Sequence, residues 1–125
     1  MWMYLAVALG GAFGAVARFS ASKYVAENFS DLSFPLATFS VNMIGSFLLG
    51  FSYVLSAEKM SLEPHVAAVI TVGFLGSFTT FSTMSLDFYH LLAEAKYLLA
   101  GIYIASSVFL GLIAAALGII MARLF

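Results

Sequence analysis

The chain contains no cysteine, so it has neither a disulfide nor a thiolate metal ligand. It has only two histidines, far apart in the sequence, which argues against a metal-dependent enzyme. Charged residues are also scarce, at 9% of the chain. We find no paired carboxylates, no Ser-His-Asp arrangement and no phosphate-binding glycine loop. The sequence therefore offers no site for catalysis, and we expect no enzyme.

Apolar residues are abundant instead. They make up 63% of the 125 residues, and the mean hydropathy is +1.07. A soluble domain of this size could not bury so much apolar surface, so the membrane is the expected solvent. We predict an all-α membrane protein, a single domain of four transmembrane helices with short connections. The predicted spans are residues 2–24, 34–55, 65–92 and 97–125, the first being a retained helix and not a signal peptide.

Two of these spans carry polar residues in register. Thr38, Asn42 and Ser46 recur every four residues, which places them on one face of a helix. One backbone carbonyl cannot satisfy the asparagine amide, so it should face either a partner helix or an aqueous path, and we favour the path. In the last span, Tyr103 and Ser107 form a similar track one turn apart.

The fourth-span track has no side chain at its next position. That position is Gly111, so the track either ends early or continues on water or backbone.

The third span contains an unusual stretch from Gly73 to Ser85, with two glycines and six hydroxyl residues near the expected midplane. Two interpretations fit it. The small residues could allow close packing with neighbouring helices. Alternatively, the helix is broken at Gly73, Gly76 and Ser77, near its middle, and the freed carbonyls bind an ion. We also include Thr83, on a polar face of this span, among the candidate pore residues.

Two charged residues lie within or near the spans. Arg18 either extends to the interface or contributes positive charge to an aqueous vestibule. Asp87 lies near the exit of the third span, where we expect a solvated helix end.

This inventory of hydroxyls, an amide and aromatic rings suits a small dehydrated anion, since it offers donors without a fixed midplane charge. The basic groups also divide evenly. The N-terminus, Lys59 and Arg123 fall on one side of the membrane, and Arg18, Lys23 and Lys96 fall on the other. Without a charge bias the chain could insert in both orientations and pair antiparallel.

Three motifs resemble those of the CrcB/Fluc fluoride channels of bacteria, and the resemblance covers essentially the whole chain. They are Gly-Gly-Ala-Phe-Gly-Ala-Val-Ala-Arg at 10–18, Pro-Leu-Ala-Thr-Phe-Ser-Val-Asn-Met-Ile-Gly-Ser-Phe-Leu-Leu-Gly at 35–50, and Gly-Phe-Leu-Gly-Ser-Phe-Thr-Thr-Phe-Ser-Thr at 73–83. The resemblance implies an antiparallel, dual-topology homodimer with two fluoride pores. It also implies a central sodium ion, held by the backbone carbonyls of Gly76 and Thr79.

The resemblance further assigns residues to the pore and its vestibule. Phe81 matches the first pore phenylalanine of the family, and the second falls at Met84, where this chain departs from the usual phenylalanine. The remaining matches are Asn42 for the pore asparagine, Tyr103 and Ser107 for the polar track, and Arg18 for the vestibule. We add Thr38 to the pore set from its register with Asn42.

The resulting prediction is a passive fluoride-selective channel of the bacterial inner membrane that exports cytoplasmic fluoride. Its partners would be fluoride, a second copy of itself and the lipid bilayer. The leading alternative is a proton-coupled small-solute exporter. Such proteins normally use an intramembrane acid or histidine, which no span carries near its centre.

Overall fold

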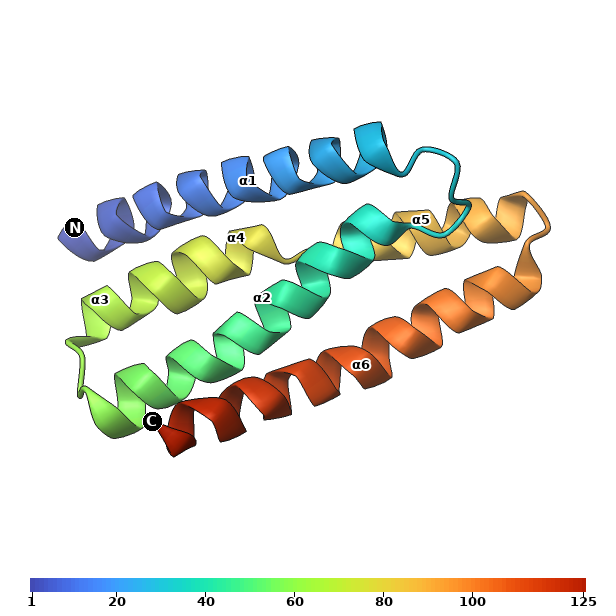
Figure 1. The fold of residues 1–125 in the computed structure, drawn as a ribbon. Coiled ribbons are helices and arrows are strands. Elements are labelled where there is room, and N and C mark those ends of the chain that lie inside the picture. The colour runs from blue at the N-terminus through green and yellow to red at the C-terminus, as the bar shows by residue number, and fades with distance from the viewer.

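The computed structural model describes residues 1–125, and every regular element is helical (Figure 1). The elements are α1 (Trp2–Asn28), α2 (Leu36–Val54), η1 (Leu55–Lys59), α3 (Pro64–Ala68), η2 (Val69–Leu75), α4 (Gly76–Phe78), α5 (Phe81–Ala93) and α6 (Tyr97–Leu124). The two η elements are short π-helical stretches that continue the preceding α-helices.

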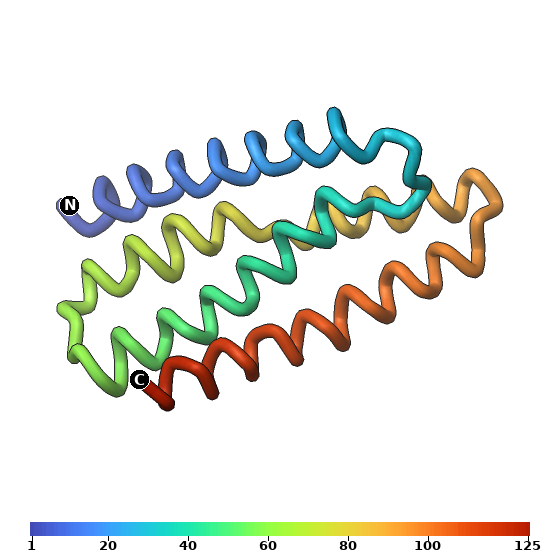
Figure 2. Tube along the Cα trace, in the orientation of Figure 1, coloured from blue at the N-terminus to red at the C-terminus, as the bar shows by residue number.

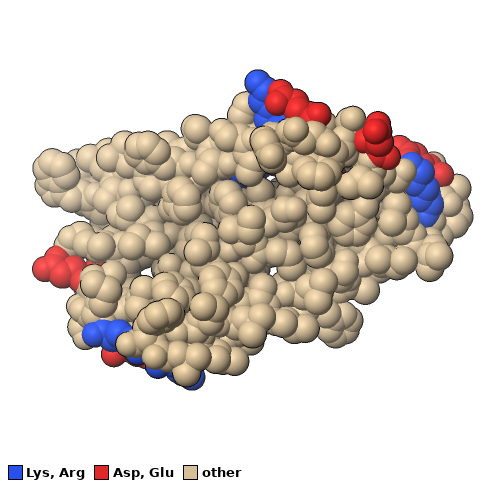
Figure 3. All heavy atoms as spheres, viewed as in Figure 1, with Lys and Arg blue, Asp and Glu red and all other residues tan.

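Four helical stretches are long and apolar enough to cross a membrane: Trp2–Asn28, Leu36–Lys59, Pro64–Ala93 and Tyr97–Leu124. The prediction of an all-helical chain with four spanning helices is thereby confirmed. Successive stretches run in opposite directions, and both termini lie at the same end of the bundle (Figure 2). The charged atoms visible in Figure 3 gather at the lower left, along the upper edge and at the right, and most of the remaining face is formed by other residues. This distribution suits a protein whose middle is surrounded by lipid.

The first helix is longer than the sequence predicts. The polar residues from Lys23 onward suggest a connection after residue 24, but α1 continues to Asn28. Lys23 and Glu27 lie one turn apart with their charged atoms 3.8 Å from each other, and the Asn28 amide donates to the Tyr24 carbonyl oxygen at 2.8 Å. The change to polar residues therefore does not end the helix, which goes on for another turn.

Glycines allow two pairs of helices to approach closely. On α1, a Cβ at Gly10 would lie 2.6 Å from the Val69 carbonyl oxygen of η2, and a Cβ at Gly73 would lie 2.7 Å from the Val7 carbonyl oxygen. Between α2 and α6, a Cβ at Gly50 would collide with the Ala115 carbonyl, and one at Gly118 with the Phe47 carbonyl. Backbone thus packs directly against backbone at these points, as is common where helices associate in lipid.

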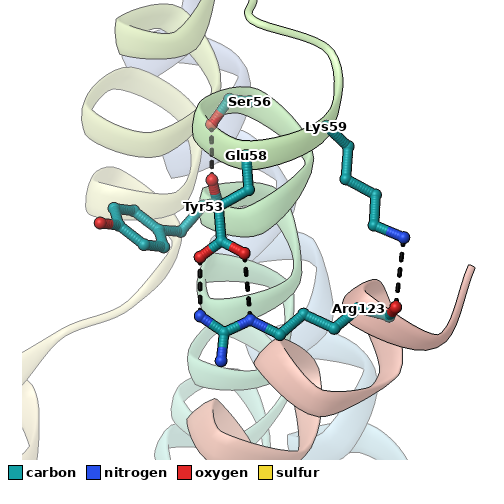
Figure 4. A network of polar contacts seen from close by, with 5 residues as sticks. All are labelled: Tyr53, Ser56, Glu58, Lys59 and Arg123. Carbon is teal, nitrogen blue, oxygen red and sulfur yellow. Dashed lines mark hydrogen bonds and ion pairs between the residues drawn. The ribbon is translucent and has the colours of Figure 1, made fainter.

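Polar contacts secure the ends of the bundle. Arg123 of α6 donates two hydrogen bonds to the Glu58 carboxylate of η1, at 2.7 and 3.0 Å, and Lys59 donates to the Arg123 carbonyl oxygen (Figure 4). At the opposite end, Lys96 lies 2.6 Å from Glu94, and its hydrogen bond lowers the pKa of that carboxyl group. These pairs are partly exposed, so each contributes little free energy.

The contact between α2 and α6 yields a first prediction. We expect Gly118→Ala to destabilise the protein by about 1–3 kcal/mol, because the new methyl group would press on backbone that cannot move aside easily. Gly101→Ala is the matched control, since no atom lies within 4 Å of a Cβ at that position of the same helix. Thermal unfolding in detergent should give a lower melting temperature for Gly118→Ala alone. Equal melting temperatures would contradict the inferred tight contact.

Candidate functional site

The helical backbone of the third spanning stretch is interrupted at two threonines. Thr79 and Thr80 have extended backbone, with φ and ψ of −82° and 157° and of −153° and 113°, between α4 and α5. The residues at which the sequence favoured a break, Gly73, Gly76 and Ser77, are themselves helical. Gly73 serves close packing against α1 instead, whereas threonine suits an extended backbone and can cap the following helix.

Asn42 of α2 holds the interruption in place. The Thr80 N–H donates to Asn42 Oδ1 at 2.8 Å, and Asn42 Nδ2 donates to the Thr80 carbonyl oxygen at 3.1 Å. In a continuous helix both backbone groups would bond within the helix. One side-chain amide therefore satisfies both backbone groups of Thr80 at the interruption.

Thr80 also begins the next helix. Its side-chain oxygen accepts from the Thr83 N–H at 3.2 Å, and its hydroxyl donates to the Thr83 hydroxyl at 3.0 Å. Thr83 was a predicted pore residue, and its hydroxyl and its N–H both take part in this helix cap.

Arg18 of α1 contacts the other side of the interruption. Its Nε donates to the Ser77 carbonyl oxygen at 3.0 Å, and the side chain is half-buried. In a continuous helix that carbonyl would accept from the N–H of Phe81. The guanidinium lies at the carbonyl end of α4, where a positive charge is favourable.

Two carbonyl oxygens near the interruption accept no hydrogen bond from a side chain or from the turn that follows α4. They belong to Gly76 and Thr79, the two residues to which the resemblance assigns a sodium ion. Carbonyl oxygens are ligands that a hard cation prefers, although the positively charged Arg18 side chain binds the intervening Ser77 carbonyl. The residues present therefore fit the implied ion.

A cavity of about 260 Å³ brings several predicted pore residues together; we call it the site cavity. Asn42, Phe81, Met84 and Ser107 all line it, and none of its nine lining residues is charged. Ser107 is buried, and its hydroxyl has no hydrogen-bond partner in the protein. A buried hydroxyl without a partner is unusual and indicates a place for a ligand or water.

Met84, which stands where the family usually has a phenylalanine, and Phe81 differ in how far they are buried. Met84 is 7% exposed and packs in the core with Leu91, Ala100 and Tyr103. Phe81 is 77% exposed, so most of its ring faces away from its own chain.

Tyr103 and Thr38 lie outside the site cavity. The fully buried Tyr103 donates its hydroxyl hydrogen to the Asp87 carboxylate at 3.2 Å and packs edge-on against Phe34. Thr38 is buried and, with Asp87, lines a second cavity of about 390 Å³. Asp87 is thus a hydrogen-bond acceptor for a buried tyrosine and not merely a solvated helix end. Its position 16 residues before Tyr103 gave no periodic signal in the sequence.

Comparisons with known proteins agree on one family. Residues 5–119 match the family described as CrcB-like protein, Camphor Resistance (CrcB). The chain is 45% identical to a fluoride-specific ion channel FluC of Saccharophagus degradans over 119 residues, or 95% of this chain and 88% of that protein. It is 42% identical to a protein of the same name from Trichormus variabilis, covering 96% and 88% of the two chains. A third FluC, from Aquifex aeolicus, is 40% identical and covers 97% of both chains.

The Arg18 contact yields a second prediction. Arg18→Gln should lower the free energy of unfolding by about 1–3 kcal/mol, because it removes a charged donor from the Ser77 carbonyl within the membrane-spanning region. Lys23→Gln, on the same helix but exposed and paired only with Glu27, should change it by less than about 1 kcal/mol. Unfolding by denaturant in detergent measures both values. Similar values for the two variants would show that the Arg18 contact contributes no more than a surface ion pair.

Proposed function

Since this chain belongs to the CrcB-like protein family, we propose that it is a passive fluoride-selective ion channel that lets cytoplasmic fluoride leave a bacterial cell across its inner membrane. The chain is a multi-pass membrane protein, and members of this family are ion channels and not enzymes. The relatives' names thus favour conduction over a proton-coupled exporter.

The observation that carries the proposal is the site cavity. It offers a free Ser107 hydroxyl and the Asn42 amide without a charged side chain. Asn42 uses one of its two N–H groups on Thr80, which leaves the other for a second acceptor. A dehydrated fluoride ion needs strong donors, yet it must also be able to leave again. Neutral hydroxyl and amide groups meet both requirements, because they bind an anion without holding it as a fixed cation would.

We further propose that two copies pair antiparallel and complete two such paths. The Gly76 and Thr79 carbonyl oxygens accept no hydrogen bond from a side chain or from the turn that follows α4. In lipid, polar backbone groups require protein or water as partners, so a second copy over this face would remove the cost of leaving them free. The even division of basic groups between the two sides supports insertion in both orientations.

A sodium ion between the two copies would account for the free carbonyl oxygens. The carbonyls of Gly76 and Thr79 from each copy would supply four oxygen ligands. When bound, the ion would hold the copies together and place positive charge between the two anion paths.

The direct test is fluoride efflux from liposomes that contain only the purified protein. We expect efflux that requires a potassium ionophore, because charge must be compensated when an anion moves alone. Liposomes loaded with chloride serve as the selectivity control. Efflux that follows an imposed pH gradient would favour the exporter instead, and no flux of either ion from a folded protein would overturn the proposal.

Phe81 gives a more local prediction. Phe81→Ile should reduce fluoride efflux at least about tenfold, because an aliphatic side chain has no positive ring edge for the anion. The fold should survive, since the ring is 77% exposed within its own chain. Phe13→Ile, on α1 and 69% exposed, is the matched control and should conduct normally. If Phe81→Ile instead abolishes the dimer on gel filtration, the residue has a packing role and its assignment to the pore is wrong.

A further inference from the structure

We propose that Ser46 of α2 supplies the hydrogen-bond donor that α6 lacks at Gly111, so that the fluoride path crosses from α6 to α2 after Ser107. This inference rests on the proposed channel function and extends it to a residue outside the set that the family resemblance assigns.

The gap on α6 follows from helical spacing. Tyr103, Ser107, Gly111 and Ala115 recur every four residues and share one face of the helix. The first two carry hydroxyl groups, whereas Gly111 and Ala115 carry none. Along α6 alone, an anion leaving Ser107 would meet no further side-chain donor on this face.

Ser46 lies beside the gap. A Cβ built on Gly111 would be 3.8 Å from Ser46 Oγ and 3.5 Å from the Met43 Cε methyl group. Nothing else lies within 4 Å of that Cβ apart from the helix's own backbone. The Ser46 hydroxyl of the neighbouring helix therefore lies next to the space that a side chain at position 111 would enter.

The Ser46 hydroxyl is also free to bind an anion. A serine or threonine within a helix commonly donates to a carbonyl of its own preceding turn. Ser56 and Thr71 do so, at 2.7 and 2.8 Å, toward Ser52 and Ala67. The Ser46 side chain makes no hydrogen bond in the protein, which is equally true of Ser40 and Ser52 on the same helix. Ser46 differs from them in bordering the site cavity, as the buried and unpaired Ser107 does. Both unpaired hydroxyls border the same cavity.

The cavities show where such a path would continue. Ser46 and Leu49 line both the site cavity and a larger one of about 650 Å³. The larger cavity extends to Ser56, Ala57 and Leu62, at the connection between α2 and α3. Ser46 thus stands at the junction between the site cavity and a space that reaches one end of the bundle, where it would receive the ion from Ser107.

The test begins with Ser46→Ala, which removes one oxygen atom and breaks no hydrogen bond within the protein. We expect fluoride efflux from liposomes to fall about tenfold, the effect of losing one hydrogen bond to a charged group. The melting temperature should not change. Wild-type efflux from Ser46→Ala would overturn the inference while leaving the proposed channel function intact. Absence of efflux from the wild-type protein would instead overturn the channel function itself.

A second substitution separates a donor role from a packing role. Adding Gly111→Ser to Ser46→Ala should restore most of the efflux, because it places a hydroxyl in the space beside position 46. Adding Gly111→Ala is the matched control and should restore nothing. Both are expected to fold, since a Cβ at 111 makes only ordinary contacts. If Gly111→Ala restored efflux as well as Gly111→Ser does, or if Gly111→Ser restored none, then positions 46 and 111 would not share the role of hydrogen-bond donor.

Discussion

Backbone groups released from a helix inside a bilayer need a partner from the protein, and the pair of hydrogen bonds between Asn42 and Thr80 meets this need at the interruption between α4 and α5. Without them, the Thr80 N–H and C=O would each need another partner, and a polar backbone group left unpaired inside a bilayer costs several kcal/mol. The extended conformation of Thr79 and Thr80 depends on this pairing. So does the position of Phe81, which begins α5 immediately after it.

The same constraint explains an arginine within a spanning stretch. A charged side chain is expensive in lipid unless it has a partner. Arg18 has one in the Ser77 carbonyl, a group that itself lost its helical partner at the interruption. The charged Arg18 side chain and the unpaired Ser77 carbonyl thus become each other's partners, and their hydrogen bond links α1 to α4. Asn42 and Arg18 approach the interruption from different helices, so α1 and α2 together fix the geometry of the candidate site.

Hydropathy was enough to predict the four spanning helices, because it reports how much apolar surface lipid must cover. Hydropathy does not report hydrogen bonding. The span predicted from it therefore stopped at residue 24, although α1 continues through Asn28. The glycines of the third span were ambiguous for a related reason. A glycine can permit either a break or a close helix contact, and Gly73 serves the contact with α1.

In the candidate site, too, spacing within one helix could be predicted from the sequence, whereas contacts between helices could not. Of the three residues that periodicity aligned on α2, Asn42 and Ser46 border the site cavity, whereas Thr38 lines the second cavity. The partner of Asn42 lies 38 residues away in the sequence, and that of Asp87 lies in another helix. No spacing rule within one helix reaches such partners. For this reason the resemblance could name Asn42, whereas its bond to Thr80 required the packed structure.

Within one chain, some backbone carbonyls of the candidate site remain without a partner. Asn42 pairs the Thr80 N–H and carbonyl, and Arg18 donates to the Ser77 carbonyl. The neighbouring carbonyls of Gly76 and Thr79 accept no hydrogen bond from a side chain or from the turn that follows α4. In lipid, carbonyl oxygens without a partner are unfavourable in the same way as the paired groups of Thr80 and Ser77 would be. These two carbonyl oxygens are therefore the groups for which our proposal supplies partners. Lipid offers neither hydrogen bonds nor cations at that depth, and for this reason our proposal places a second copy and an ion there.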